Sequence, residues 1–420
     1  MIRLPALTHA FGRVAFTLLA GIPLASLALA ADAADAWPSH YSSAPRSAHA
    51  GSGSRQTTAP STWTVNNTAD SYTDGTAANC VADNANTCSL RDAIAASGDG
   101  DTIVFSNLFD TPQTINVDQT LVITTSVTIT GPGTSLLTLT ANGGGNYSII
   151  ESNSGTVAIS GMTIAGGFHG VGGALANLTD LTVSDVIFRN NNASDQGGAI
   201  FNAGTLHVDR STFTGNAAHF GGALFNTTSG TSVGVATITN STFFGNMSLY
   251  PYLGSAIATY GSGSNGGTAA IHLQNCTIAG NKGVLVPVLV AIYSGGGPAS
   301  LDLVNTIISG NDGVSFDVIN GAPGNYTSLG NNLSSDNGSG VLVASGDLIN
   351  SNPLLSKLGN YGGTTPTLYP MAGSPAIDAG SSTGEPATDQ RGVTRPQGNG
   401  YDIGAVEANG ELLFQNGFDS

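Results

Sequence analysis

Hydrophobic and polar positions follow one eleven-residue pattern that recurs between residues 157 and 311. The first and third positions of each copy are apolar, as in a strand with one buried face, and the eighth position is apolar as well. Repetition at this length predicts a stack of similar structural units. The six copies are VAISGMTIAGG (157–167), LTVSDVIFRNN (181–191), LHVDRSTFTGN (206–216), ATITNSTFFGN (236–246), IHLQNCTIAGN (271–281) and LDLVNTIISGN (301–311).

Turns are expected at two places in each unit. One is a corner at the fourth and fifth positions of the pattern. The other is the end of the pattern, where four copies carry Gly-Asn, a pair that tolerates positive φ in a tight turn. A second strand-like phrase follows most copies and completes the unit. These phrases are GGALAN (172–177), GGAIFN (197–202), GGALFN (221–226) and the weaker GSAIAT (254–259) and VAIYSG (290–295).

When such units stack, residues at the same position of the pattern lie above one another and form columns. Aliphatic columns would fill the interior, an asparagine column would lie at one turn, and coils would follow one another at the strand spacing of ~4.8 Å. The pattern therefore predicts an all-β parallel β-helix. The loop after each Gly-Asn pair varies in length, so insertions should gather on one side of the helix.

The phrases GGA[IL]-F-N and F-x-G-N resemble the repeats of the polymorphic outer-membrane protein family, which are bacterial surface proteins. The resemblance covers roughly residues 157–311. It implies a single-stranded right-handed parallel β-helix of the pectin-lyase-like type, which we expect to occupy residues 111–345. The motifs are short and rich in glycine, so they indicate the fold far more than the activity.

The first residues predict export. Residues 1–30 combine two arginines with a long apolar run and a small-residue end, which is typical of a secretory signal peptide cut near Ala30. A retained membrane anchor is disfavoured because Gly21 and Pro23 interrupt the run, and no later segment is long and apolar enough to span a bilayer. Residues 31–62 have no hydrophobic period and are expected to form a disordered linker.

The net negative charge of the chain limits the kinds of molecule that it is expected to bind. The chain carries a formal net charge of −16, and loss of the signal peptide removes two basic and no acidic residues, so the charge becomes −18. An acidic, lysine-poor surface disfavours nucleic acid and anionic membranes as partners. A polysaccharide or a cell-surface glycan remains as the expected partner of a monomeric protein.

Three cysteines divide into a pair and a single residue. Cys80 and Cys88 lie close together in an exported segment, which favours a local disulfide over a metal site, because no further ligand lies nearby. Cys276 falls in the sixth column of the pattern, among small and apolar residues. We interpret it as a buried free thiol, with a reactive cysteine as the alternative.

A short helix is predicted directly after Cys88. Ser89 can cap it and Asp92 stands at the capping-box spacing, while Leu90, Ala93 and Ile94 form one apolar stripe. Such a helix would cover the open end of the β-helix. The phrase CSLRDAIAAS, followed by GDTIVF, resembles the CSLREA-type N-terminal domain of exported bacterial β-helix proteins. This domain is expected to span residues 63–110.

The segment that closes the chain resembles the C-terminal region of choice-of-anchor Q proteins, through NPLLSKLGNYGGTTPTLYPMAGSPAIDAG (352–380), TDQRGVTRP (388–396) and YDIGAVE (401–407). No membrane-spanning anchor follows. The tail, 409–420, is similar to short tails of exported Gram-negative proteins, which implies a secreted or surface location. We expect residues 346–408 to close the β-helix. Their mixed charges predict salt bridges, with a catalytic site or a structural calcium as alternatives, and comprise Asp378, Asp389, Arg391, Arg395, Asp402 and Glu407.

Loops between the Gly-Asn turn and the GGA phrase carry aromatic and polar residues that stacking should bring to one edge. Aromatic rings stack on sugar faces and acids accept hydrogen bonds from hydroxyls, so this edge is a candidate glycan-binding groove. Ordinary surface packing is the alternative. The candidates are Phe168, His169, Asp195, His219, Phe220, Tyr250 and Tyr252.

A non-catalytic adhesin-like or glycan-binding protein is the function we expect, and a polysaccharide lyase or glycoside hydrolase is the alternative. A hydrolase needs two carboxylates ~5–10 Å apart, and a lyase needs a basic residue beside acidic calcium ligands. Apart from Asp195, the catalytic candidate of the enzyme alternative, no catalytic residue, metal ligand or cofactor is predicted. Arg189, Arg210 and Lys282 do not share a column with one another and are interpreted as solvated surface charges. Among the acidic candidates Asp185, Asp195, Asp209 and Asp302, no two share a column in neighbouring coils.

Overall fold

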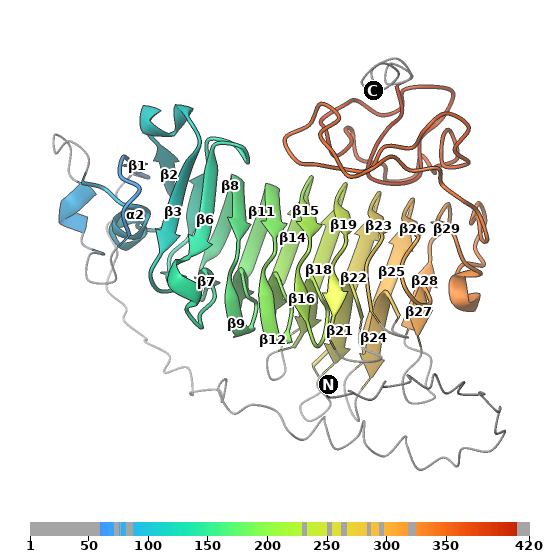
Figure 1. Cartoon of the computed structure of the whole chain (residues 1–420), viewed down its shortest axis with the longest axis horizontal. Coiled ribbons are helices and arrows are strands. Elements are labelled where there is room, and N and C mark those ends of the chain that lie inside the picture. Colours follow the sequence, from blue (N-terminus) through green and yellow to red (C-terminus); the bar gives the residue numbers. More distant parts are fainter. Residues whose placement is uncertain are drawn as a thin grey trace, which may run out of the picture. The chain divides into compact units, whose positions relative to one another are not determined.

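The fold was analysed in a computed structural model, which describes residues 59–70, 75, 77–80, 87–228, 233–249, 254–261, 267–283, 287–293, 298–317 and 325–409. All of them belong to one compact unit, Ala50–Ser420. Its strands stack in parallel as a solenoid (Figure 1), which confirms the right-handed parallel β-helix. The expected signal peptide, most of the expected linker, the tail beyond Asn409, and Tyr250 and Tyr252 lie outside the described residues.

The largest sheet has two arms that meet at the predicted corner. Strands β8 and β11 run through the corner, and in later coils separate strands form the two arms. The first arm consists of β1 (Thr62–Val65), β2 (Asp101–Phe105), β5 (Val127–Thr130), the first halves of β8 (Thr156–Ala165) and β11 (Asp180–Arg189), β14 (Thr205–Asp209), β18 (Gly234–Thr239), β22 (Ala269–Gln274), β25 (Ala299–Val304) and β28 (Asn325–Ser328).

The second arm follows the corner in each coil. It is formed by the second halves of β8 and β11 together with shorter strands. These are β3 (Gln113–Val117), β6 (Leu137–Ala141), β15 (Thr212–Thr214), β19 (Thr242–Phe244), β23 (Thr277–Ala279), β26 (Ile307–Ser309) and β29 (Leu333–Ser334).

Two smaller sheets complete the coils. The GGA phrases and their weaker copies lie in an eight-stranded sheet, and loops that precede them contribute a four-stranded sheet. The first contains β4 (Leu121–Ile123), β7 (Ile150–Ser152), β10 (Leu175–Asn177), β13 (Ile200–Asn202), β17 (Leu224–Thr227), β21 (Ile257–Gly261), β24 (Leu289–Tyr293) and β27 (Phe316–Asp317), and the second contains β9 (Phe168–Val171), β12 (Asn192–Gln196), β16 (Ala217–Ala218) and β20 (Met247–Ser248).

The corner is made by a column of residues in the left-handed conformation. In successive coils the fifth position of the pattern has φ of 55° at Asp185, 45° at Arg210 and 47° at Asn240. Asn275 and Asn305 continue the column with φ of 50° and 49°. Asparagine and aspartate are the non-glycine residues that adopt this conformation most readily, which explains their abundance at this position.

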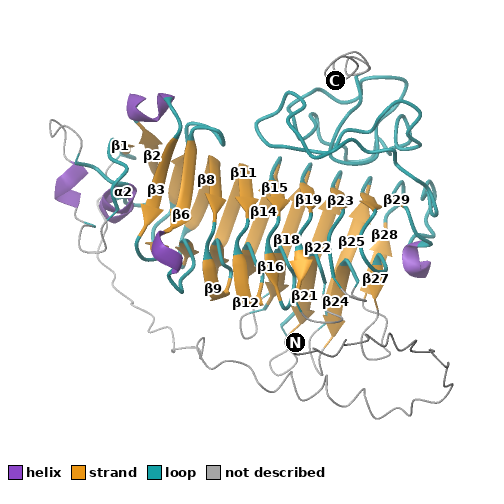
Figure 2. Cartoon of the chain, in the orientation of Figure 1, coloured by secondary structure: helices purple, strands orange, loops and turns teal. Residues whose placement is uncertain are grey.

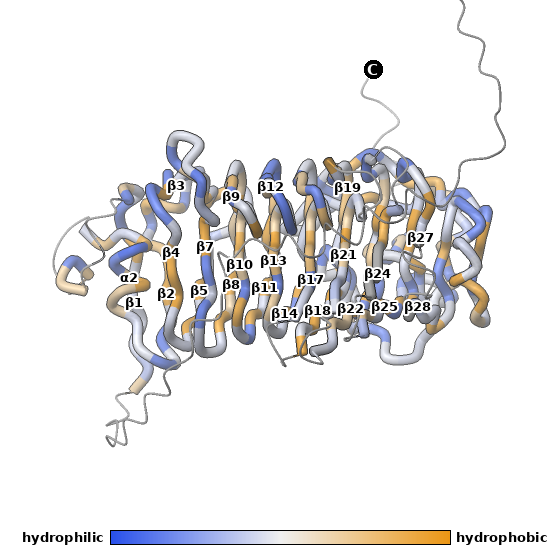
Figure 3. The backbone as a smooth tube through the Cα atoms, turned by 90° about the horizontal axis from the view of Figure 1, so that it is seen from below, coloured by the Kyte–Doolittle hydropathy of each residue, from blue (hydrophilic) through white to orange (hydrophobic). Residues whose placement is uncertain are grey.

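The interior is filled by the columns that the pattern predicts. Residues at the first, third, sixth and eighth positions are buried in all six copies. In the eighth column Phe188, Phe213 and Phe243 stack with centroid distances of 4.8 and 4.4 Å. Figure 3 shows hydrophobic and hydrophilic stretches alternating along the coils, as expected when every strand has one buried face.

A buried asparagine ladder stabilises the Gly-Asn turns. The side-chain amide of Asn216 donates to the side-chain oxygen of Asn246 at 2.9 Å and to the carbonyl of Phe188 at 3.0 Å. The same pattern joins Asn191, Asn246, Asn281 and Asn311 to their neighbours. Each buried amide is thereby satisfied, which removes the cost of burying a polar group without a partner.

The N-terminal end is covered by the predicted helix. Helix α2 (Leu90–Ala96) begins with a capping box between Ser89 and Asp92, and Leu90 and Ala93 belong to the main core. Arg91 pairs with Asp70 at 2.7 Å. The Cys80–Cys88 disulfide is present, as predicted, beside the short helix η3 (Ala77–Cys80). In the part of the chain that the structure describes, three further 3-10 helices are η4 (Asn107–Asp110), η5 (Asn142–Gly144) and η7 (Gly338–Gly340).

The C-terminal region, defined here as residues 351–409, is almost entirely loop (Figure 2). It does not continue the stack, but folds back along the outer side of the second arm. Gln390 is fully buried between this arm and the loop, and its side chain contacts Thr212 and Thr242 at 3.0 and 2.6 Å. Gly404 lies so close that a Cβ atom there would meet Ile307 at 2.7 Å. The region therefore packs along the flank of several coils.

Candidate functional site

A hollow of about 340 Å³ lies where the C-terminal region meets the outer face of the first arm. Its floor comes from the neighbouring strands β11, β14 and β18, and its wall comes from residues 386–388. Hydroxyl groups dominate, with one imidazole and one carboxylate among them. The lining residues are Thr182, His207, Val208, Asp209, Thr237, Thr239, Asn240, Pro386, Ala387 and Thr388.

The repeat places these floor residues side by side. Side chains at the second and fourth positions of the pattern point away from the core, because the first and third point into it. Parallel register then aligns Thr182, His207 and Thr237 in one outer row. Asp209 and Thr239 lie in register in a second row. The floor is thus a regular array of polar groups, with one from β11 and two each from β14 and β18.

Asp209 is the carboxylate of the hollow. Burial raises its pKa, and the neighbouring guanidinium of Arg210 opposes this rise. Arg210 forms ion pairs with Asp209 and with Asp185, the latter at 2.7 Å. Arg210 was expected to be a solvated surface charge, but it is half-buried between two acids. Asp209 therefore serves as an oriented hydrogen-bond acceptor whose charge is compensated.

The wall of the hollow is held by Asn240, which belongs to the corner column. Its amide nitrogen donates to Asp209 at 3.3 Å, and its oxygen accepts from Arg395 at 3.4 Å. Next to it, the carbonyl of Ala387 accepts from the amide of Arg395 at 3.0 Å. Asn240 thus connects the floor of the hollow to the C-terminal region.

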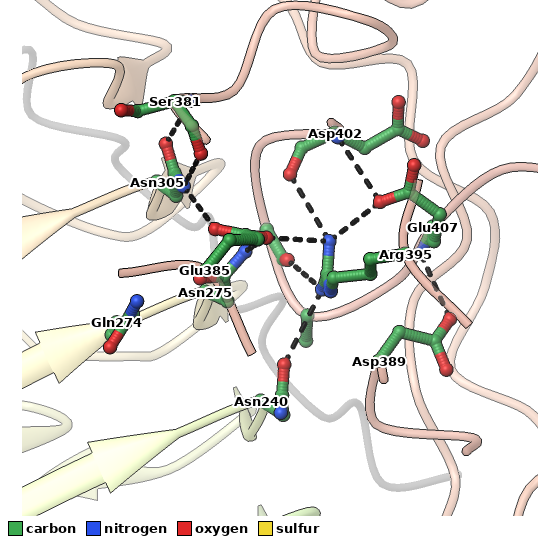
Figure 4. A network of polar contacts seen from close by, with 12 residues as sticks. Asn240, Gln274, Asn275, Asn305, Ser381, Glu385, Asp389, Arg395, Asp402 and Glu407 are labelled. Atoms are coloured by element: carbon green, nitrogen blue, oxygen red, sulfur yellow. Dashed lines mark hydrogen bonds and ion pairs between the residues drawn. The ribbon is translucent and has the colours of Figure 1, made fainter. Parts of the chain in front are cut away.

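Arg395 is the centre of a buried polar network, which we call the clamp. Figure 4 shows it between Glu407 and Glu385, with Asn240 below. The Arg395 guanidinium lies 2.8 Å from Glu407 and 3.3 Å from Glu385. Glu385 in turn accepts hydrogen bonds from Asn275 and Asn305, both at 2.6 Å. The clamp therefore ties the C-terminal region to the corner column.

Four of the six charged C-terminal residues named from the sequence form salt bridges, as predicted. Arg391 pairs with Asp389 at 2.8 Å, and Arg395 pairs with Glu407. Asp402 accepts from the amide of Asp378 at 2.7 Å, and burial raises the pKa of Asp402 to about 7. This arrangement explains the cluster as a packing device between loops.

The loop edge predicted from sequence is only partly assembled. Asp195 and His219 lie close enough that the imidazole lowers the pKa of Asp195, against a larger rise caused by burial. The Phe168 side chain is 41% exposed. The ring of His169 is instead engaged with the Ser148 hydroxyl at 3.2 Å and the Val171 carbonyl at 3.0 Å.

Phe220, another candidate of the loop edge, is only partly buried. It packs edge-on against Phe225 with a centroid distance of 6.1 Å and joins an apolar cluster with Phe201 and Ala258. This cluster is separate from the main core and lies on the outer face of the eight-stranded sheet, because neighbouring strand residues face opposite ways. The groove of stacked rings at the loop edge stays a prediction.

Sequence reasoning missed His207, Asp209 and Thr237 as floor residues. The signal was present in the second and fourth positions of the pattern, which carry polar side chains in register. It could not reveal the wall, because residues 386–388 have no periodic relation to the repeats. The hollow exists only through this long-range packing.

No family profile matches the chain, and no curated protein matches it significantly. Among the described residues, no helix is long and apolar enough to cross a membrane. Within the same part of the chain, no group of three or more His, Cys, Asp or Glu side chains is placed to hold a metal ion.

Proposed function

We propose that the chain is an exported β-helix protein that binds glycans without cleaving them. The observation that carries this proposal is the hollow beside His207 and Asp209. Its floor presents hydroxyls, an imidazole and a carboxylate paired with Arg210, and these groups form hydrogen bonds with sugar hydroxyls. Pro386 adds an apolar surface against which a sugar ring can pack.

Export and surface location belong to the same proposal. They are supported by the apolar, small-residue start of the chain and by the resemblance to CSLREA-type, choice-of-anchor Q and polymorphic outer-membrane proteins. The Cys80–Cys88 disulfide agrees with an oxidising compartment, where disulfides persist.

A carbohydrate-active enzyme remains the second candidate because of Asp195. Burial raises the pKa of Asp195, which is the direction required of a general acid. In the hollow, by contrast, Asp209 is paired with Arg210 and accepts from Asn240. The carboxylate of the hollow thus suits binding better than proton transfer.

The test is retention on immobilised polysaccharides combined with product analysis. Purified protein is incubated with uncharged, uronate-containing and amino-sugar polymers, and bound protein, unsaturated products and new reducing ends are measured together. We expect retention on at least one polymer with neither product. Retention on none would refute glycan binding. Products that disappear in Asp195→Asn would establish the enzyme instead.

A further inference from the structure

We propose that the hollow is one part of a longer binding track that takes a linear, uncharged polysaccharide lying parallel to the solenoid axis. This inference rests on the proposed glycan-binding function and specifies its ligand and orientation. The track is defined by the outward second position of the pattern in five successive coils and by the fourth position in the first four of them. Its residues are Thr182, Ser184, His207, Asp209, Thr237, Thr239, His272, Gln274 and Asp302.

The track is straight because the coils are in register. Thr182 pairs with His207, His207 with Thr237, Thr237 with His272, and His272 with Asp302. Neighbouring strands are ~4.8 Å apart, so five coils extend for ~19 Å. A β-1,4-linked hexose chain in its extended form advances by a similar distance per sugar. Each sugar can therefore meet an equivalent pair of side chains on the next coil.

Side chains at the fourth position of the eleven-residue pattern form a second row beside the row at the second position. Ser184, Asp209, Thr239 and Gln274 are aligned by the same register. In the first four coils of the track, two polar side chains per coil suit the hydroxyls on the two edges of a sugar ring. An array of this kind recognises a repeating polymer rather than a single small molecule.

The C-terminal region borders the track beyond the hollow. The side-chain amide of Gln274 donates to the carbonyl of Gly384 at 2.7 Å, one coil after Thr239. Residues 384–388 thus lie along the second row on at least two coils. This border turns the flat sheet face into a one-sided groove and favours a ligand that follows the axis.

Charge favours an uncharged polymer. Asp209 is compensated by Arg210, and Asp302 lies 2.7 Å from the Nδ1 atom of His272. Each carboxylate of the track is thus already engaged with a neighbouring side chain of the protein, which disfavours its pairing with the ammonium group of an amino-sugar polymer. The net charge of −16 repels polyuronates. A neutral glucan or a similar uncharged β-1,4-linked chain fits both conditions.

Binding of cello-oligosaccharides of two to six residues, measured by calorimetry on the full protein, tests this proposal. We expect the Kd to fall with each added sugar up to about five, the number of coils in the track. Thr237→Arg places a long side chain on the floor of the hollow and should weaken binding at least about ten-fold. His272→Ala should weaken the longer oligomers more than the dimer.

Thr128→Ala is the matched control, because Thr128 lies in the same outward column but is separated from Thr182 by Ala158. It should leave every Kd unchanged, and circular dichroism should show all variants folded. If wild-type protein binds the oligomers but Thr237→Arg does not weaken them, the track is refuted while glycan binding stands. Binding that does not depend on length overturns the axial orientation. Binding only to polyuronate or amino-sugar polymers overturns the ligand class, and binding to no glycan refutes the proposed function as well.

Discussion

Arg395 and Glu407 form an ion pair of 2.8 Å in which both side chains are almost completely removed from solvent. Breaking a buried pair from one side leaves a charge without compensation, which typically costs about 3–5 kcal/mol. We therefore expect Arg395→Met to lower the free energy of unfolding by this amount in chemical denaturation. Hydrogen exchange should rise first in residues 351–409, since the clamp is their attachment to the corner column.

The exposed Arg189 supplies the control for this experiment. Arg189→Met should change stability by less than about 0.5 kcal/mol. The single variant Arg395→Met leaves two buried carboxylates, Glu385 and Glu407, without their counter-charge. The double variant Arg395→Met/Glu407→Leu removes one of them and should be more stable than Arg395→Met alone. A double variant that is less stable than the single one would show that the ion pair is not the dominant interaction.

Phe213→Ala tests the stacked interior. Phe213 is fully buried between Phe188 and Phe243, so loss of its ring leaves a cavity and should cost about 3–5 kcal/mol. Coils contact mainly their neighbours, and the damage should therefore be local. Hydrogen exchange is expected to rise in β15 and adjacent coils. A uniform rise in every coil would contradict the solenoid description.

The three cysteines should differ sharply in reactivity. Cys276 is fully buried, and burial raises its pKa to about 12, so it should resist alkylation at pH 8 until the protein unfolds. Intact-mass analysis should detect one disulfide and one thiol per chain. Reduction of the Cys80–Cys88 disulfide opens a short loop and so increases the conformational entropy of the unfolded chain. It should lower the free energy of unfolding by about 2–3 kcal/mol. Rapid labelling of Cys276 in the folded protein would show that its coil opens.

Asp402 gives the protein a defined pH dependence. Burial raises the pKa of Asp402 from 3.8 to about 7, so the folded state retains a proton that the unfolded state loses between these values. The contribution of Asp402 to stability is therefore complete below about pH 4 and is lost as the pH rises through about 7. Denaturation of wild type and Asp402→Asn across pH 4–8 measures it. The stability of wild type relative to the variant should fall over this range, and a constant difference would contradict the raised pKa.

The periodic part of the molecule was predictable because each feature depends on a local rule repeated in every coil. Alternation identified the buried columns, the Gly-Asn pairs identified the ladder, and Ser89 with Asp92 identified the helix cap. The free, buried state of Cys276 followed from its column alone. Because parallel register aligns equivalent positions in successive coils, an inference made for one coil applied to the others.

The candidate site was not predictable in the same way. The wall of the hollow depends on contacts between segments far apart in sequence, such as Gln390 with Thr212. Such contacts have no periodic signal, and the sequence suggested only that the C-terminal segment closes the fold. The surroundings of Phe220 could not be predicted either. The repeat pattern does not distinguish a ring that faces solvent from a ring that packs against an apolar cluster outside the main core.

The asparagine ladder has a direction. Every side-chain amide, from Asn191 through Asn281, donates to the coil that follows it, so one coil is the smallest unit that preserves the donor–acceptor order. Gain or loss of a whole coil in frame would leave both junctions matched, whereas a coil without the asparagine would leave two donors of the preceding coil without their acceptor, the backbone and side-chain amides of its asparagine. The length of the molecule can therefore change in single-coil steps at little energetic cost, and the reach of its outer surface would change with it.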